Sequence, residues 1–288
     1  MEGALAKIRP HISSSLPHQK IPAHLLIALE TTFREQNTES TPTAYFAAIL
    51  TTIDGSIQKK EISLDESAVL PAELYLLALV SPFVPAPIIR TNLDTLLFLT
   101  APLFPSLNQH PPALRSQLSL YHSIFRSLDR TQLDVQGIRQ SFASILHLCL
   151  DPRPKIRKKA ADMVKDLLSS PPVPLMRHPY SERVSDWVKN TLTDASTLPF
   201  GKGKGAKKSS VSGTEVAIHV LACLRPIIPY LPPEVCWCMC KLIISSLIFQ
   251  IVVPPYNNES HYDPSGPWKY LSFPIVLFHT VRCICCFS

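Results

Sequence analysis

Glycine is scarce in this sequence and proline is abundant. The 288 residues include only eight glycines but 28 prolines. Sheet proteins with many tight turns rely on glycine, whereas proline interrupts helices between apolar segments. This balance disfavours a β-rich fold and indicates short helices that end abruptly. The predicted fold class is therefore all-α.

Cysteine is nearly absent from most of the chain, and no export signal is evident. Of the eight cysteines, only Cys149 and Cys223 precede residue 236. This part should lack a disulfide framework and contain reduced thiols, as in the cytosol or nucleus. Residues 1–20 lack the apolar core of a secretory signal. The apolar run 242–253 is shorter than the roughly 20 residues that span a bilayer, so we expect no membrane association.

Signatures of catalysis are missing as well. The run GKGKGAKKSS at 201–210 resembles a phosphate-binding loop, but Ala206 stands where that loop needs its second glycine, and no strand precedes it. The sequence contains no GxSxG elbow, HExxH pair or EF-hand pattern. We therefore predict that the chain is not an enzyme and binds no cofactor, metal or small-molecule substrate.

The most regular pattern spans two neighbouring segments, 134–150 and 154–168. Apolar residues recur in both at steps of three and four, which places them on one stripe of a helix. Asp151 and Pro152 end the first helix, because a residue before proline is disfavoured in the α region. Pro154 suits the first turn of the second helix, where its missing N–H costs nothing. Two short amphipathic helices are thus predicted to meet at a tight turn.

The rest of the chain repeats this plan. Residues 1–20 have no periodicity and are predicted to be a mobile tail, and residues 196–213 a flexible basic loop. Further segments with helical spacing lie at 25–33, 41–53, 70–79, 88–99, 113–128, 181–192 and 214–229. A single helix pair cannot bury its own apolar stripe, so pairs must stack. We predict a HEAT- or armadillo-like superhelical solenoid of about five helix pairs over residues 21–235.

The turn between the two central helices carries a recognisable motif. The order Asp151, Pro154 and Arg157 resembles the second-helix signature of HEAT and armadillo repeats. In those families the Asp sits in the turn and the Arg reaches back to it or to a neighbouring repeat. The resemblance implies that these residues are structural; an ordinary helical hairpin is the alternative.

Longer segments resemble one family. They are TPTAYFAAILTTI (41–53), LHLCLDPRPKIRKKAADMVKDLL (146–168), HPYSERVSDWV (178–188) and LRPIIPYLP (224–232). They look like the amino-terminal part of the ribosomal RNA processing protein 12 family, whose members are HEAT-repeat proteins much longer than this chain. The resemblance covers about residues 21–235.

The resemblance implies a non-catalytic scaffold in the nucleus and nucleolus. Such a protein binds pre-ribosomal particles, pre-rRNA and other assembly factors, and supports rRNA processing and subunit export. The alternative is a karyopherin-like nuclear transport adaptor, which binds a GTPase or a cargo protein.

Positive charge is concentrated in one region. Residues 151–210 contain thirteen basic and six acidic residues, a net charge of +7, whereas the whole chain carries +6. Such a region is typical of phosphate contacts. The predicted RNA- or partner-binding residues are Arg153, Lys155, Lys158, Lys159, Lys165, Lys202, Lys204, Lys207 and Lys208. A solvated helix face and, for 202–208, a nuclear-import signal are the alternatives. Aromatic residues do not interleave with the lysines, so backbone contact is favoured over base stacking.

The character of the sequence changes after Glu234. Residues 236–288 contain six cysteines and uneven apolar runs without a helical stripe. The cysteines within each of the two clusters are at most one residue apart, which does not fit the common zinc spacing of two residues between ligands. The terminal CCFS fits a prenylation box poorly. We expect this atypical tail to be foreign to the repeat sequence, as a translated intron or truncated gene model would be.

Overall fold

The computed structural model of this protein describes residues 1–58, 68–197 and 213–233. The chain divides into two compact units, Met1–Leu231 and Pro232–Ser288, and the helices described below all lie in the first. Most of the predicted basic loop 196–213 and the whole predicted tail 236–288 lie outside the described residues.

All regular structure in the described residues is helical, so the predicted all-α class is confirmed. The α-helices are α1 (Glu2–Leu5), α2 (Pro17–Glu35), α3 (Pro42–Gln58), α4 (Val69–Val80), α5 (Ala86–Thr91), α6 (Leu93–Thr100), α7 (Phe104–Leu107), α8 (Pro111–Ser127), α9 (Arg130–Leu133), α10 (Gln136–Leu148), α11 (Pro154–Leu168), α12 (Ser181–Thr197) and α13 (Gly213–Leu224). Short 3-10 turns are η1 (Arg9–Ser13), η2 (Ser81–Phe83), η3 (Ala101–Leu103) and η4 (Ile228–Tyr230).

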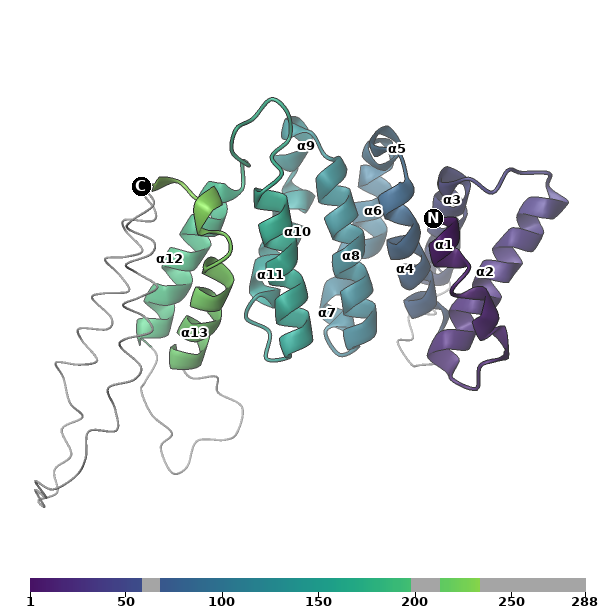
Figure 1. Cartoon of the computed structure of the whole chain (residues 1–288), viewed down its shortest axis with the longest axis horizontal. Helices are drawn as coiled ribbons and strands as arrows, with labels where there is room; N and C mark the ends of the chain where they lie inside the picture. The colour runs from purple at the N-terminus through teal and green to yellow at the C-terminus, as the bar shows by residue number, and fades with distance from the viewer. Residues whose placement is uncertain (59–67, 198–212, 234–288) are drawn as a thin grey trace, which may run out of the picture. The chain divides into compact units, whose positions relative to one another are not determined.

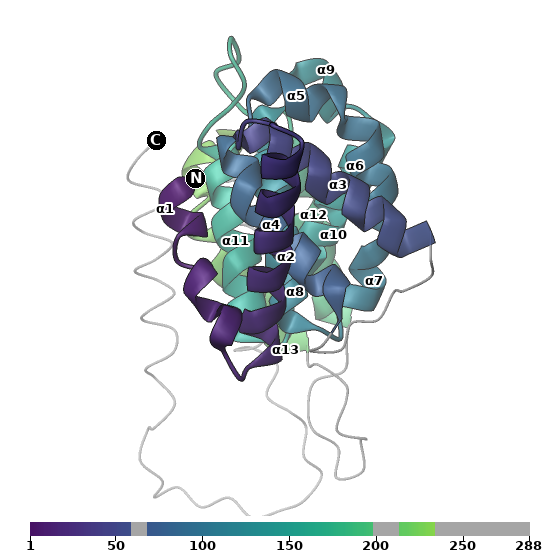
Figure 2. The same cartoon turned by 90° about the vertical axis from the view of Figure 1, so that its right-hand side faces the viewer.

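The long helices alternate between two layers along the chain (Figure 1). In one layer α2 packs on α4, α4 on α8, and α8 on α11. Figure 2 shows α3, α6, α10 and α12 on the other side of these helices. Contacts between α3 and α4, α10 and α11, and α12 and α13 join the layers. This stacking of helix pairs is the predicted HEAT-type solenoid.

The central helix pair forms as its periodicity predicts. In α10 the buried stripe includes Ile138, Phe142 and Ile145. In α11 it includes Ile156 and Val164, and the proline at the start of this helix occupies its first turn. Both stripes face the interior between the layers, because neither helix can bury its apolar side alone.

An aromatic cluster joins three successive parts of the stack of helix pairs. The ring of Phe142 in α10 lies 5.7 Å from Phe125 of α8 and 4.3 Å from Tyr180, which precedes α12. The Tyr180 hydroxyl donates a hydrogen bond to the carbonyl oxygen of Leu133 at 2.5 Å. Beside it, buried His178 accepts the Tyr180 backbone N–H at Nδ1, at 3.1 Å. The cluster therefore fixes the connection between α11 and α12 onto α8, α9 and α10.

The amino-terminal residues differ from the predicted mobile tail. They form α1, η1 and the start of α2, and Leu5 is fully buried. The Arg9 guanidinium pairs with Glu30 of α2 at 2.7 Å, and Glu30 also accepts the hydroxyl of Tyr45 from α3 at 3.1 Å. This polar anchor holds the segment onto the first helix pair. It explains order in a stretch that has no apolar periodicity.

Candidate nucleic-acid interface

The turn between α10 and α11 is organised by the Asp151 carboxylate. This side chain is only 5% exposed, and it accepts the backbone N–H of Arg153 at 2.8 Å. The Arg153 guanidinium donates two further bonds, to Oδ1 at 2.8 Å and Oδ2 at 2.6 Å. Burial raises the pKa of Asp151, but the bonds from Arg153 outweigh burial and hold the pKa below its usual value.

Arg153 is a structural residue in this arrangement. Besides Asp151, its guanidinium bonds the carbonyl oxygen of Asn108 at 2.6 Å and the Asn108 side-chain oxygen at 2.7 Å. It therefore ties the turn to the connection between α7 and α8. Its positive charge alone predicts Arg153 to be an RNA-binding residue. Its donors are engaged within the protein, so we leave it out of the candidate interface.

Arg157 also reaches back to the turn. Its guanidinium donates to the backbone carbonyl of Asp151 at 2.7 Å and, more weakly, to that of Pro152 at 3.4 Å. The resemblance to HEAT repeats implied this direction. The acceptor is a carbonyl of the turn itself, two residues after Cys149, the C-cap of α10.

Three lysines of α11 lie apart from this network. Lys155, Lys158 and Lys165 are exposed, while the apolar stripe of the same helix is buried. With the exposed Asp162 they recur every three or four residues, so they share one outward face. We call Lys155, Lys158 and Lys165 the basic face. The exposed Asp166, next to Lys165, adds a second carboxylate, so three ammonium groups against two carboxylates leave this face with a net charge of +1.

A groove opens beside the basic face. It encloses about 600 Å³ between the start of α2, α4 and α8, with Lys159 of α11 at its edge. Its apolar lining includes Ile8, Ile21, Pro71, Ala78 and Leu79. Its basic lining consists of His11, His18, His110, Arg115 and Lys159. Within residues 1–58, 68–197 and 213–233, none of the residues that line it is acidic.

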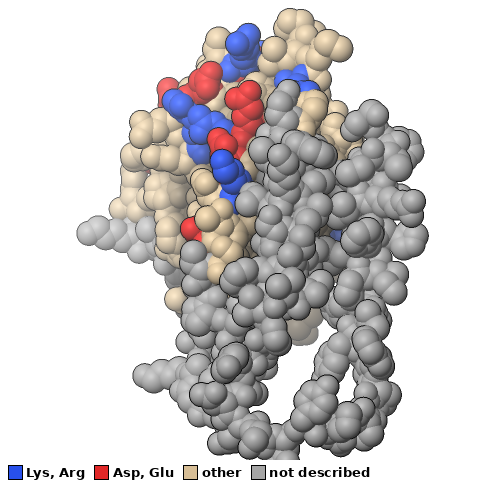
Figure 3. Space-filling model, turned by 90° about the vertical axis from the view of Figure 1, so that its left-hand side faces the viewer, with Lys and Arg blue, Asp and Glu red and all other residues tan. Residues whose placement is uncertain are grey.

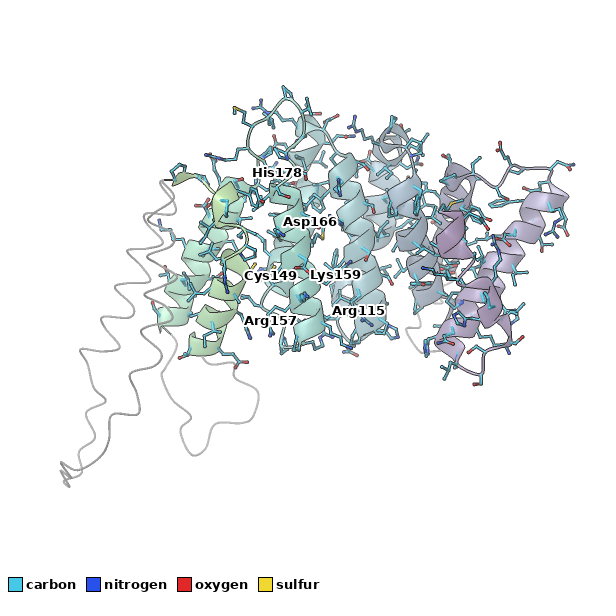
Figure 4. The ribbon with its side chains drawn as sticks, in the orientation of Figure 1. Arg115, Cys149, Arg157, Lys159, Asp166 and His178 are labelled. Atoms are coloured by element: carbon cyan, nitrogen blue, oxygen red, sulfur yellow. The ribbon has the colours of Figure 1, made fainter. Side chains whose placement is uncertain are left out.

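The sequence analysis missed most of this groove. Figure 4 shows Arg115 and Lys159 on the neighbouring helices α8 and α11. Forty-four positions separate them in the chain, and the lining histidines come from three further places in the sequence. Only the stacking of the repeats brings these groups together. Lys159 was predicted as a binding residue, and the structure places it half-buried at the groove rather than on the basic face.

Other predicted features are less informative. Lys202, Lys204, Lys207 and Lys208 lie outside the described residues. On the face shown in Figure 3, the coloured basic and acidic side chains are intermixed. Cys149 and Cys223 are buried free thiols.

Across residues 1–58, 68–197 and 213–233, no three His, Cys, Asp or Glu side chains are grouped as metal ligands would be. In the same part of the chain, no helix combines the length and the apolar character that a bilayer crossing requires.

The alternating layers, the Asp151 turn and the amphipathic helix pairs define a HEAT-repeat protein. Comparison with family profiles matches residues 9–250 to the family described as RRP12-like, N-terminal HEAT repeats. This match covers most of the chain, so the chain belongs to that family.

Individual relatives agree with this assignment. The chain is 27% identical over 221 residues to ribosomal RNA-processing protein 12 of Saccharomyces cerevisiae, a match that covers 72% of this chain and 18% of the yeast protein. It is 25% identical to the RRP12-like protein of Gallus gallus, over 81% of this chain and 17% of the relative. It is 26% identical to the human RRP12-like protein, over 76% of this chain and 16% of the relative. The matched regions thus cover about a sixth of the length of these relatives.

Proposed function

We propose that this chain is a non-catalytic scaffold in ribosome biogenesis. In this proposal it binds pre-ribosomal particles and other assembly factors in the nucleus and nucleolus, and it supports ribosomal RNA processing and subunit export. Membership of the RRP12-like family and the similarity to yeast ribosomal RNA-processing protein 12 support a role in this pathway. The basic face of α11 contacts the phosphates of pre-rRNA.

One observation carries the RNA contact. The N-cap Arg153 and Arg157 of α11 bond the turn, and Lys159 lies at the groove, whereas Lys155, Lys158 and Lys165 are exposed. Exposed ammonium groups on one helix face attract phosphates without reading sequence. The arginines hold the helix in place, and the lysines remain available to a partner.

The test replaces all three lysines of the basic face by glutamate. Binding of single-stranded RNA is measured over a range of salt concentrations, and association with pre-ribosomal particles is measured by co-sedimentation. Loss of three phosphate contacts should weaken RNA binding at least about tenfold and reduce the slope of log K against log salt by about 2.

The matched control is the triple variant Lys7→Glu, Lys20→Glu and Lys189→Glu. These lysines are also exposed: Lys7 precedes η1, Lys20 lies in α2 and Lys189 lies in α12. The control therefore changes the net charge by the same amount as the α11 variant. Retained binding by this control together with loss in the α11 variant supports the proposal. Equal behaviour of the two variants would contradict it.

The same co-sedimentation assay separates the scaffold from the transport-adaptor alternative. A scaffold stays on the particles whichever nucleotide a nuclear transport GTPase carries. Release by one nucleotide form of the GTPase would instead favour the karyopherin-like adaptor.

A further inference from the structure

The groove between α2, α4 and α8 combines an apolar lining with two cations, Arg115 and Lys159. Arg115 is exposed on α8, and Lys159 of α11 is half-buried at the edge. Neither side chain forms an ion pair with another residue in the described part of the chain. His18 adds a further polar group from α2. The groove therefore offers donors for carboxylates beside a surface for apolar side chains.

We propose that this groove binds an extended acidic peptide segment of a partner protein, one in which acidic and apolar residues alternate. Charge complementarity supports this occupant, because the described residues of the lining include basic groups and no acidic one. In an extended peptide successive side chains point to opposite sides. Such a segment can place apolar groups against Leu79 and the neighbouring floor and direct its carboxylates to Arg115 and Lys159.

The shape and lining favour a peptide over RNA. The volume of about 600 Å³ lies within the range of sites that enclose a small ligand or a short segment. Single-stranded RNA is usually held by a cationic track together with several aromatic platforms. Among the described residues that line the groove, Tyr75, 41% exposed, is the one Phe, Tyr or Trp side chain, and much of this lining is aliphatic. The inference does not depend on the RNA contact proposed for the basic face.

The test uses the full chain and a defined probe. The probe is a fluorescein-labelled twelve-residue peptide of alternating glutamate and leucine, and binding is followed by fluorescence anisotropy. Two control peptides replace every glutamate by glutamine or by lysine. We expect the glutamate peptide to bind at least about tenfold more tightly than either control.

Two variants address the groove by different means. Arg115→Glu reverses the charge at its edge, and Ser116→Trp fills space with a bulky ring at a half-buried lining position. Each should weaken peptide binding about tenfold or more. The matched control is Arg126→Glu, an exposed arginine of the same helix about 16 Å further along and outside the lining. Unchanged helix content and melting temperature show that each variant is folded.

The outcomes divide clearly. Loss in both groove variants with retention in Arg126→Glu and in the basic-face triple variant supports the proposal, even if the RNA contact fails. Equal binding of the three peptides, or equal binding by all variants, would overturn it. Competition of the peptide by single-stranded RNA, with loss of RNA binding in Arg115→Glu and Ser116→Trp, would also overturn it and assign the groove to RNA.

Discussion

Replacing Asp151 by alanine should lower the free energy of unfolding of the helix-pair stack more than replacing any exposed acidic residue of α11. The carboxylate accepts one backbone N–H and two guanidinium bonds at 2.6–2.8 Å, and it is 5% exposed. Its loss leaves the Arg153 charge without its counter-ion in a partly buried site. Bonds to a charged group contribute about 1.5–3 kcal/mol each, but the guanidinium is 31% exposed and water replaces part of them.

We therefore expect a loss of about 2–4 kcal/mol in the free energy of unfolding. For a domain of this size that corresponds to a fall in melting temperature of about 5–15 °C. Thermal unfolding followed by circular dichroism measures the total effect, and hydrogen exchange in α10 and α11 locates it. The matched control is Asp162→Ala, because Asp162 is exposed on the same helix.

A double-mutant cycle with Arg153→Ala isolates the pair. If the turn depends on this ion pair, the double variant should be less destabilised than the sum of the single variants by about 1 kcal/mol or more. A cost below about 1 kcal/mol for Asp151→Ala, or additive single effects, would refute the reasoning. In that case the turn would be held by the backbone and by Arg157 alone.

Three further predictions follow from other anchors. Burial lowers the pKa of His178 to about 4, below the usual 6.5, so between these pH values only the unfolded state takes up a proton. The free energy of unfolding should be highest above pH 6.5 and fall by up to about 3 kcal/mol as the pH drops towards 4. In urea titrations, His178→Asn should flatten this pH dependence. Tyr180→Phe removes the donor to the Leu133 carbonyl and should cost about 1–2 kcal/mol by the same measurement, with the exposed Tyr75→Phe as control. Arg9→Ala breaks the pair with Glu30 and should cost about 1 kcal/mol while speeding amide exchange in residues 2–13; unchanged exchange there would contradict the anchor.

A helix was predictable where its own sequence shows which of its residues are buried. The stripe of α11 repeats every three or four residues over its whole length, so its helical form and its buried side follow from the sequence. The order of the amino-terminal residues was not predictable in this way. It depends on a polar contact among Arg9, Glu30 and Tyr45, which belong to three different elements.

The candidate site shows the same division. Arg153 and Lys155 are both basic and only two positions apart, but the turn geometry directs the arginine onto Asp151 and leaves the lysine exposed. Composition alone could not separate them. The groove is harder still to foresee, because it needs residues from α2, α4, α8 and α11 at once. Local periodicity carries no information about which side chains of different repeats become neighbours.

The two proposed binding surfaces share one helix, and this has a consequence for affinity. α11 contributes Lys155, Lys158 and Lys165 to the basic face and Lys159 to the groove. On a particle that presents both RNA and an acidic protein segment, contact at one surface would hold the other ligand close to its own surface. The second contact would then form at a high effective concentration. Against separate RNA and peptide probes, the basic-face variant and Arg115→Glu should each affect only their own ligand. Against a whole particle each should weaken binding, and the double variant should bind more weakly than either single one. If the basic-face variant alone accounts for the entire loss on particles, the groove does not contribute to particle binding, and the peptide it accepts belongs to a partner outside them.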